Sequence, residues 1–212
     1  MNKGASSILK VLHCAAPGAV LIEAVQHQKP WLPCFLATAD TIPAGPIPFH
    51  SASVLAHTAR CMDAVAGDPL AVWMALTHDA GKLTTPSALL PHHYGHELRG
   101  KKLASIWAQE LDLSNDYAQA GVMTALLHMK AGRYLRLRPA KKYDLLQTVV
   151  KSGFFSSFWK VVDADTKSSI STTALADWQM ICAMPMDDTN PELTRQRRIS
   201  LLKTITSSNA KE

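Results

Sequence analysis

A histidine and an aspartate stand side by side in the stretch ALTHDAGK, residues 75–82, behind an apolar run and just before a glycine. His78 and Asp79 are expected at the end of a buried helix, where an imidazole and a carboxylate are costly unless each has a partner. A metal ion is one partner that satisfies both. The adjacent pair is a weak indication by itself, because it also arises by chance.

Two more ionisable residues fall on the apolar faces of separate predicted helices. His57 recurs with Val54 and Cys61 at helical spacing, which turns its side chain towards the interior. Asp165 follows Phe158 by seven residues and therefore shares a strongly hydrophobic face. A single buried histidine is more often a hydrogen-bonded core residue than a ligand. The argument for a metal site therefore depends on the combination.

Imidazole and carboxylate groups from three helices form a definite kind of ligand set. They suit a borderline or hard divalent ion, namely Ni, Mn, Co, Fe, Zn or Mg. The absence of thiolate at the ligand positions disfavours a purely structural zinc site.

Helical spacing prevails along the chain and period-2 alternation is scarce, so the sequence predicts an all-α fold. Asp68 and Pro69 are typical of a helix start, and Gly81 is expected to end that helix. Asn190 and Pro191 are expected to open the last helix. The predicted helices cover about residues 51–66, 68–80, 97–111, 115–130, 140–151 and 154–166, and the region from 191 onwards.

The proline-rich run TIPAGPIP, residues 41–48, is interpreted as a connector. It separates an N-terminal helical segment, 1–44, from a main body, 45–212, and the two are expected to form one globular unit. A second break is expected in the polar stretch 168–173. No DNA-binding motif and no internal repeat is found.

The composition fits a folded chain with a mild basic balance. Of the 212 residues 47% are hydrophobic, which argues against disorder, and the formal charge of +5 suits an anionic substrate without requiring one. Lys10, His13 and Pro17 interrupt the N-terminal apolar stretch, so neither a signal peptide nor a membrane span fits. The cysteines are scattered and expected to be reduced, as in a cytoplasmic protein: Cys14, Cys34, Cys61 and Cys182.

The order of His57, then His78 with Asp79, then Asp165 resembles the H…HD…D signature of the HD-domain metal-dependent phosphohydrolases. The resemblance implies an HD-domain helical bundle in which these four residues are the metal ligands. His50 precedes His57 and competes with it for the first ligand position, although the context AHTARCMD favours His57.

The resemblance narrows to one kind of HD domain. Residues 76–100, LTHDAGKLTTPSALLPHHYGHELRG, resemble the C-terminal HD domain of bacterial tRNA nucleotidyltransferases, the CCA-adding enzymes. Residues 126–146 and 158–169 resemble two later blocks of that domain, and the likeness covers about residues 45–170. No counterpart of the family's nucleotidyltransferase domain is found, so the chain is not expected to add CCA by itself.

The resemblance implies a phosphohydrolase of the 2′,3′-cyclic phosphodiesterase and phosphatase type, acting on nucleotides or RNA ends through a metal-activated water. Asp79 is then expected to hold and help deprotonate that water, with Lys82 and His96 as further catalytic groups. Three side chains are expected to meet the substrate or a second ion: His93, His128 and Arg133. The alternative is a hydrated histidine-rich loop for His93 and His96, and plain burial for His128.

A run of basic residues follows the predicted helix that carries His128. It suits phosphate-backbone contacts, for instance to tRNA, although such a run is more often a solvated face. The run interleaves with Tyr134 and consists of Arg133, Arg136, Arg138, Lys141 and Lys142.

Two alternatives to the phosphodiesterase hypothesis stay open. One is a nucleotide monophosphate phosphatase of the wider HD group, for which RNA is irrelevant. The other is a non-catalytic tRNA-binding or partner-binding module in which the ion only stabilises the fold. The sequence does not decide the metal, the physiological substrate or the oligomeric state.

Overall fold

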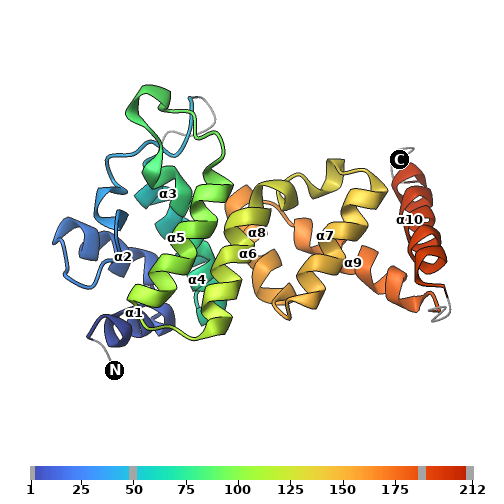
Figure 1. Cartoon of the computed structure of the whole chain (residues 1–212), viewed down its shortest axis with the longest axis horizontal. Coiled ribbons are helices and arrows are strands. Elements are labelled where there is room, and N and C mark those ends of the chain that lie inside the picture. Colours follow the sequence, from blue (N-terminus) through green and yellow to red (C-terminus); the bar gives the residue numbers. More distant parts are fainter. Residues whose placement is uncertain (1–2, 48–51, 186–189, 209–212) are drawn as a thin grey trace.

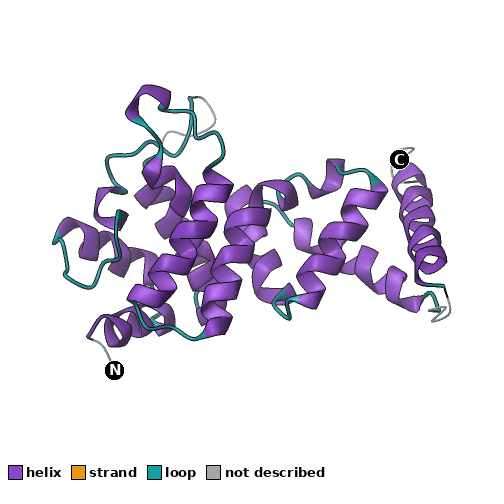
Figure 2. Cartoon of the chain, viewed as in Figure 1, coloured by secondary structure: helices purple, strands orange, loops and turns teal. Residues whose placement is uncertain are grey.

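The computed structural model describes residues 3–47, 52–185 and 190–208, and these form helices and loops without a strand (Figure 2). The described residues form ten α-helices: α1 (Lys3–His13), α2 (Pro17–Gln26), α3 (Val54–Ala64), α4 (Pro69–Thr77), α5 (His96–Glu110), α6 (Asn115–Ala131), α7 (Pro139–Lys151), α8 (Phe155–Thr166), α9 (Ile170–Ala183) and α10 (Pro191–Ser208). Four short 3₁₀ helices join them: η1 (Leu36–Thr38), η2 (Ala80–Thr84), η3 (Ser87–Leu89) and η4 (Tyr134–Arg136). The all-α prediction is confirmed.

The helices form an elongated bundle (Figure 1). α5 and α6 lie side by side, and both pack against α4. α1, α2 and α3 cover one side of this group, and α8 contacts α3, α4 and α6. α7, α9 and α10 extend the bundle at the other end, where α10 packs on α7 and α9.

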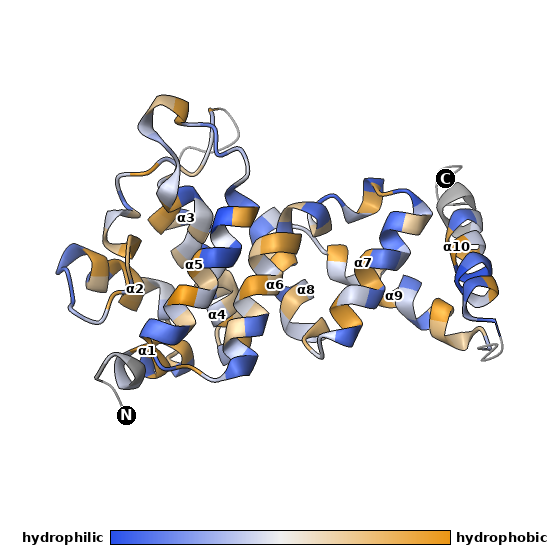
Figure 3. Cartoon of the chain, in the orientation of Figure 1, coloured by the Kyte–Doolittle hydropathy of each residue, from blue (hydrophilic) through white to orange (hydrophobic). Residues whose placement is uncertain are grey.

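α4 is the most deeply buried helix of the bundle. Every residue of α4 from Ala71 to Thr77 is buried, whereas hydrophobic and hydrophilic residues alternate around most other helices, as amphipathic packing requires (Figure 3). Large aromatic side chains fill the space around it, and each is at most 2% exposed: Trp73, Trp107, Phe158 and Trp159. α4 therefore carries the residues at its C-terminal end into the interior.

Small residues let the helices around α4 approach closely. A Cβ atom added at Gly121 on α6 would lie 2.8 Å from Trp73 Nε1 and 3.2 Å from Thr77 Oγ1. A Cβ atom at Gly100 on α5 would lie 3.2 Å from Ala125 Cβ. These contacts hold α5 and α6 against each other and α6 against α4.

Most predicted helices are present, with two corrections. The helix that Asp68 caps ends at Thr77 and not near Gly81, because η2 continues the turn through Gly81 in a tighter 3₁₀ form. The polar break predicted at 168–173 is shorter, because α9 begins at Ile170. Asp163 Oδ1 accepts a hydrogen bond from Ser171 N and so holds the start of that helix.

Two further predictions concern membrane insertion and the division of the chain into two segments. No helix of the described residues is long and apolar enough to cross a membrane. The boundary between 1–44 and 45–212 stays a prediction, although Ile8, Leu12 and Leu21 belong to the same hydrophobic core as the main body.

Asp68 links the start of α4 to α8. Its carboxylate accepts hydrogen bonds from Ala71 N, Ser157 Oγ and Lys160 Nζ. We expect Asp68→Ala to lower the free energy of unfolding by about 1–2 kcal/mol, because it removes the N-cap together with the contacts to α8. Asp68→Asn keeps a capping side chain and is expected to lose less. Urea unfolding at neutral pH measures both, and an Asp68→Ala variant as stable as wild type would contradict the assignment.

The same carboxylate makes this difference depend on pH. Partial burial acts to raise the pKa of Asp68, but the hydrogen bonds from Lys160, Ala71 and Ser157 outweigh it and hold the pKa below its usual value. Such a group stabilises the fold above its unfolded-state pKa of about 3.9 and loses that effect as the pH falls through the folded-state pKa. The stability gap between wild type and Asp68→Ala should therefore shrink below about pH 4.

Candidate metal centre

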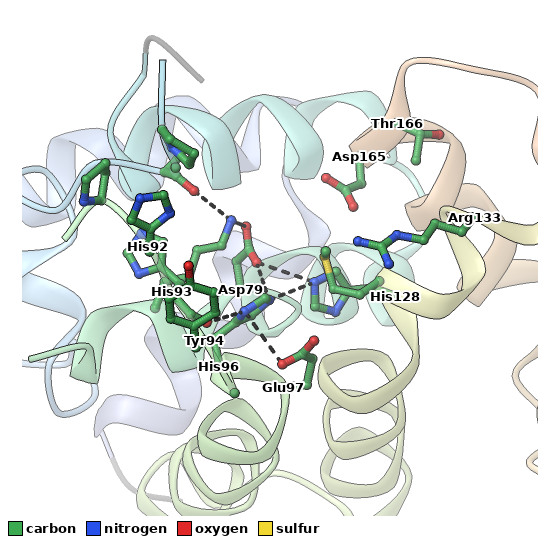
Figure 4. A pocket seen from close by; sticks show the side chains of 17 residues that line it. Asp79, His92, His93, Tyr94, His96, Glu97, His128, Arg133, Asp165 and Thr166 are labelled. Atoms are coloured by element: carbon green, nitrogen blue, oxygen red, sulfur yellow. Dashed lines mark hydrogen bonds and ion pairs between the residues drawn. The ribbon is translucent and has the colours of Figure 1, made fainter. Parts of the chain in front are cut away.

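Asp79 lies at the floor of a cleft of about 630 Å³. In Figure 4 His96 and His128 lie close to Asp79, Arg133 lies on one side, and His92 and Tyr94 lie on the other. Asp79 directly follows His78, the C-cap of α4, and precedes η2. Its side chain is 1% exposed. The two carboxylate oxygens face two different groups of side chains.

The first cluster surrounds Asp79 Oδ2 and comes from α3, the end of α4 and α8. His57 Nε2 lies 3.1 Å from His78 Nε2 and 3.2 Å from Asp165 Oδ1. Asp79 Oδ2 lies 3.4 Å from His57 Nε2 and 3.3 Å from His78 Nε2. Cys61 Sγ stands at the edge of the cluster, 3.9 Å from His57 Nε2. The four predicted ligands are thus brought together.

The second cluster surrounds Asp79 Oδ1 and comes from α5 and α6. His96 Nε2 lies 3.5 Å and His128 Nε2 3.4 Å from this oxygen. The two imidazole nitrogens lie 3.3 Å from each other. Asp79 therefore stands between the two clusters, with one oxygen towards each.

Backbone carbonyls fix the orientation of three of the imidazoles. The Nδ1 atom of His78 lies 2.7 Å from Ala75 O, and that of His96 lies 2.9 Å from His93 O. His128 Nδ1 lies 3.1 Å from Ala125 O. Since a carbonyl only accepts, Nδ1 of each ring carries a proton and Nε2 is the nitrogen that faces Asp79, where it can bind a metal ion when the ring is neutral.

The pKa values follow from this crowding of charge. Burial acts to raise the pKa of Asp79, but His78 and Lys82 outweigh it and hold the pKa well below its usual value. Burial likewise opposes the ionisation of Asp165, yet the hydrogen bond with His57 and the charge of His78 lower its pKa to about 2. Burial lowers the pKa of His96, which favours its neutral form. These groups are therefore ionised carboxylates and, at His96, a neutral imidazole.

The residues present fit a divalent ion. Neither oxygen of the buried Asp79 carboxylate accepts a hydrogen bond of regular geometry from the described residues, and such buried atoms are normally satisfied. The ammonium of Lys82 contacts Asp79 Oδ2 alone of the two carboxylates in the clusters. Atoms bonded to one ion about 2.1 Å away lie roughly 3.0–3.8 Å apart. The distances between histidine nitrogens, and between histidine nitrogens and carboxylate oxygens, given above for the two clusters fall in this range. The two clusters are HD-like histidine and aspartate sites that could hold a metal ion.

Lys82 is held inside the site. Its Nζ atom lies 2.7 Å from Asp79 Oδ2 and donates to Ala44 O at 2.8 Å. The side chain is 8% exposed. Lys82 therefore compensates the charge of Asp79 and joins it to the segment 41–47. It also lines the cleft, and its catalytic role stays a prediction.

His93 and Arg133, the other two predicted contacts, occupy different positions in the cleft. Both ring nitrogens of His93 are engaged, Nδ1 with Thr85 Oγ1 and Nε2 with Pro43 O, each at 2.8 Å. His93 thus joins two loops while it lines the cleft, and its contact with substrate or a second ion stays a prediction. Arg133 is exposed and lines the cleft. His50 lies outside the described residues.

The basic run after α6 is only partly a surface. Lys142 is buried and its Nζ atom lies 3.3 Å from Asp177 Oδ2. Tyr134 is buried as well and donates from its hydroxyl to the same oxygen at 2.7 Å. Lys142 is therefore not available for phosphate contacts, and RNA contact by the rest of the run stays a prediction. The exposed cations of the run are Arg133, Arg136, Arg138 and Lys141.

Sequence reasoning missed two features of the site. Arg60 donates to Ala164 O at 2.7 Å and contacts Asp165 O at 3.4 Å, so it ties α3 to the end of α8 that carries Asp165. Its position three residues after His57 was the only available signal. The segment 44–46, interpreted as a connector, forms part of the wall of the cleft.

Comparison with known proteins gives relatives for part of the chain. A multifunctional CCA protein of Legionella pneumophila (strain Lens) is 37% identical over 92 residues, which are 43% of this chain and 22% of that protein. One from Thioalkalivibrio sulfidiphilus is 39% identical over 119 residues, 55% of this chain and 28% of that protein. One from Actinobacillus pleuropneumoniae is 28% identical over 148 residues, 65% of this chain and 36% of that protein.

Part of this chain is homologous to multifunctional CCA proteins. The matched region makes up between 22% and 36% of the length of these CCA proteins. No protein-family model and no solved structure matches the chain. The homology agrees with the resemblance drawn from the sequence motifs.

A metal ion that binds the folded protein should raise its melting temperature. At an ion concentration of 100 times the dissociation constant the stabilisation is about 2.7 kcal/mol. We expect Mn, Co, Ni or Zn to produce such a shift in metal-stripped protein. Thermal unfolding with each ion measures it, and a melting temperature that no ion changes would contradict the site.

Variants locate the ion. Asp165→Asn and His78→Ala should reduce the metal-induced shift, whatever their own melting temperatures, because each removes a ligand. His13→Ala serves as control, because this exposed histidine lies far along the chain on α1. Loss of the shift in the control as well would indicate non-specific binding.

Proposed function

We propose that this protein is a metal-dependent phosphohydrolase that cleaves 2′,3′-cyclic or monoester phosphates of nucleotides or RNA ends. The observation that carries the proposal is the convergence of four histidine Nε2 atoms and the Asp165 carboxylate around Asp79 at the floor of an open cleft. The partial homology to multifunctional CCA proteins supports the same class.

In this proposal the first cluster holds the principal ion through His57, His78, Asp79 and Asp165. A divalent ion bound there supplies Lewis acidity, which lowers the pKa of a water molecule and polarises a phosphoryl oxygen. The low pKa of Asp79 keeps its carboxylate charged, as a metal ligand should be. The same low pKa makes the carboxylate a weak base towards the water molecule. We therefore assign Asp79 the task of holding and orienting the water more than of taking its proton.

The second cluster is proposed to hold a second ion through Asp79 Oδ1, His96 and His128. The lowered pKa of His96 keeps its imidazole neutral. A metal ligand must be a neutral imidazole, whereas a general acid must carry the extra proton, so the shift favours the role of ligand. The ions proposed for both clusters belong to the set Ni, Mn, Co, Fe, Zn and Mg.

The rim of the cleft is proposed to bind the phosphate. Arg133 presents a guanidinium beside Asp165 and Thr166 (Figure 4), and such a planar fork matches phosphate oxygens. Arg136 and Arg138 follow it on the surface. An RNA end, including that of tRNA, is a substrate that these further cations would favour.

The decisive variant is Asp79→Asn. It keeps the volume of the side chain and removes the charge that both clusters share, so we expect hydrolysis of adenosine 2′,3′-cyclic phosphate to fall to the level of the metal-stripped protein. Phosphate-ester hydrolysis is followed by ³¹P NMR with Mn, Co, Ni or Mg added. Full activity of Asp79→Asn would refute the proposal.

The choice of substrate separates the alternatives. Faster hydrolysis of deoxynucleotide monophosphates than of cyclic ribonucleotides would favour a general nucleotide phosphatase. Retention of metal and tRNA binding without turnover of any phosphate ester would indicate a non-catalytic module.

Arg133 has a matched control nearby. Arg133→Ala should raise KM for a phosphate ester roughly tenfold with a smaller effect on kcat, because a charge-assisted contact is lost. Arg136→Ala removes an exposed arginine that does not line the cleft and should raise KM for the same ester far less. Equal effects of the two substitutions would show that only the overall charge matters.

A further inference from the structure

Two aromatic rings are stacked on the wall of the cleft that faces Arg133 (Figure 4). The rings of His92 and Tyr94 have centroids 5.6 Å apart and planes inclined by 12°. Both residues line the cleft, and Tyr94 is 71% exposed. A large aromatic side chain that stays in water beside a metal centre leaves one face free for a ligand.

The backbone behind this pair is held in place. His93, between the two rings, is hydrogen-bonded to Thr85 and Pro43 through its two ring nitrogens. Tyr94 O accepts from Arg99 Nη1 at 2.7 Å, and the following Gly95 has a positive φ of 69° that favours glycine. The rings are therefore mounted on a fixed loop, which lowers the cost of ordering them when a ligand binds.

The two walls of the cleft differ in chemistry. One carries the guanidinium of Arg133 next to the carboxylate floor, where a phosphate and its metal would lie. The other carries the stacked rings. A ligand that fills both has a phosphate at one end and a flat π system at the other, and a cleft of about 630 Å³ lies within the range of small-molecule sites.

We propose that the stacked pair of His92 and Tyr94 is a nucleobase platform that makes the protein selective for nucleoside phosphates over base-free phosphate esters. This inference rests on the proposed phosphohydrolase function and adds the group that selects the substrate. Bases stack on aromatic side chains largely independently of their identity. The platform thus accepts all four bases and favours the larger purines.

The test compares adenosine 2′,3′-cyclic phosphate with glycerol 1,2-cyclic phosphate, which has the same strained diester ring and no base. Stacking on one aromatic side chain corresponds to roughly a tenfold difference in binding. Tyr94→Ala should therefore lower the ratio of kcat/KM for the two esters about tenfold, mainly through KM for the adenosine ester. Tyr94→Phe keeps the ring and should keep the ratio.

Leu98→Ala is the matched control, because Leu98 is 65% exposed on α5 and does not line the cleft. It should leave the ratio as in wild type. An unchanged ratio in Tyr94→Ala, or a Tyr94→Phe variant as impaired as Tyr94→Ala, would overturn the platform while leaving the phosphohydrolase proposal intact.

Failure of the enzymatic proposal has a different signature. If the wild type hydrolyses neither ester, calorimetric titration with adenosine 3′-monophosphate and with glycerol phosphate replaces the kinetic ratio. The platform then requires Tyr94→Ala to weaken binding of the adenosine compound more than that of glycerol phosphate. Equal weakening, or none, would refute it.

Discussion

A buried carboxylate that must stay ionised governs the arrangement of this protein. Asp79 lies at the end of a fully buried helix, where an isolated charge would be very costly. The ammonium of Lys82 and the imidazoles on both sides of Asp79 offset this cost. Asp165 adds a second carboxylate to the same cluster, beside His57 and His78. The fold therefore concentrates negative charge and nitrogen lone pairs in one place, which is the condition under which a divalent ion stabilises a site.

The convergence on Asp79 requires helices that approach more closely than ordinary side chains allow. A Cβ atom at Gly81 would lie 1.9 Å from His96 O, so η2 can pass the start of α5 only with glycine there. This contact sets the distance between Asp79, two residues before, and His96. Gly121 similarly brings α6, and with it His128, against α4. The glycine after the histidine and aspartate pair thus acts by close packing, not by ending a helix.

The sequence predicted the residues that helical periodicity turns inward, but not the contacts between segments far apart in the chain. Helical spacing identified His57 and Asp165 as inward-facing, because burial on a helix repeats every three or four residues. The same reasoning could not show that Lys82 points back to Asp79 and Ala44, since this depends on how the segment 41–47 returns over η2. For the same reason the sequence could not show that His93 joins Thr85 to Pro43. Local patterns carry no information on such partners 38 to 50 residues away.

The helices beyond the metal centre still contribute to it through Arg133. Tyr134, the next residue, is fully buried against Trp159, and its hydroxyl is bound by Asp177 of α9. Lys142 of α7 reaches the same carboxylate, so η4 is held from two helices. The position of a side chain on the rim of the cleft is only as well defined as the position of the backbone that carries it. The polar contact between α9 and η4 therefore fixes one wall of the cleft, as the hydrogen bonds of His93 fix the other, and the candidate metal centre lies between two walls that are held independently.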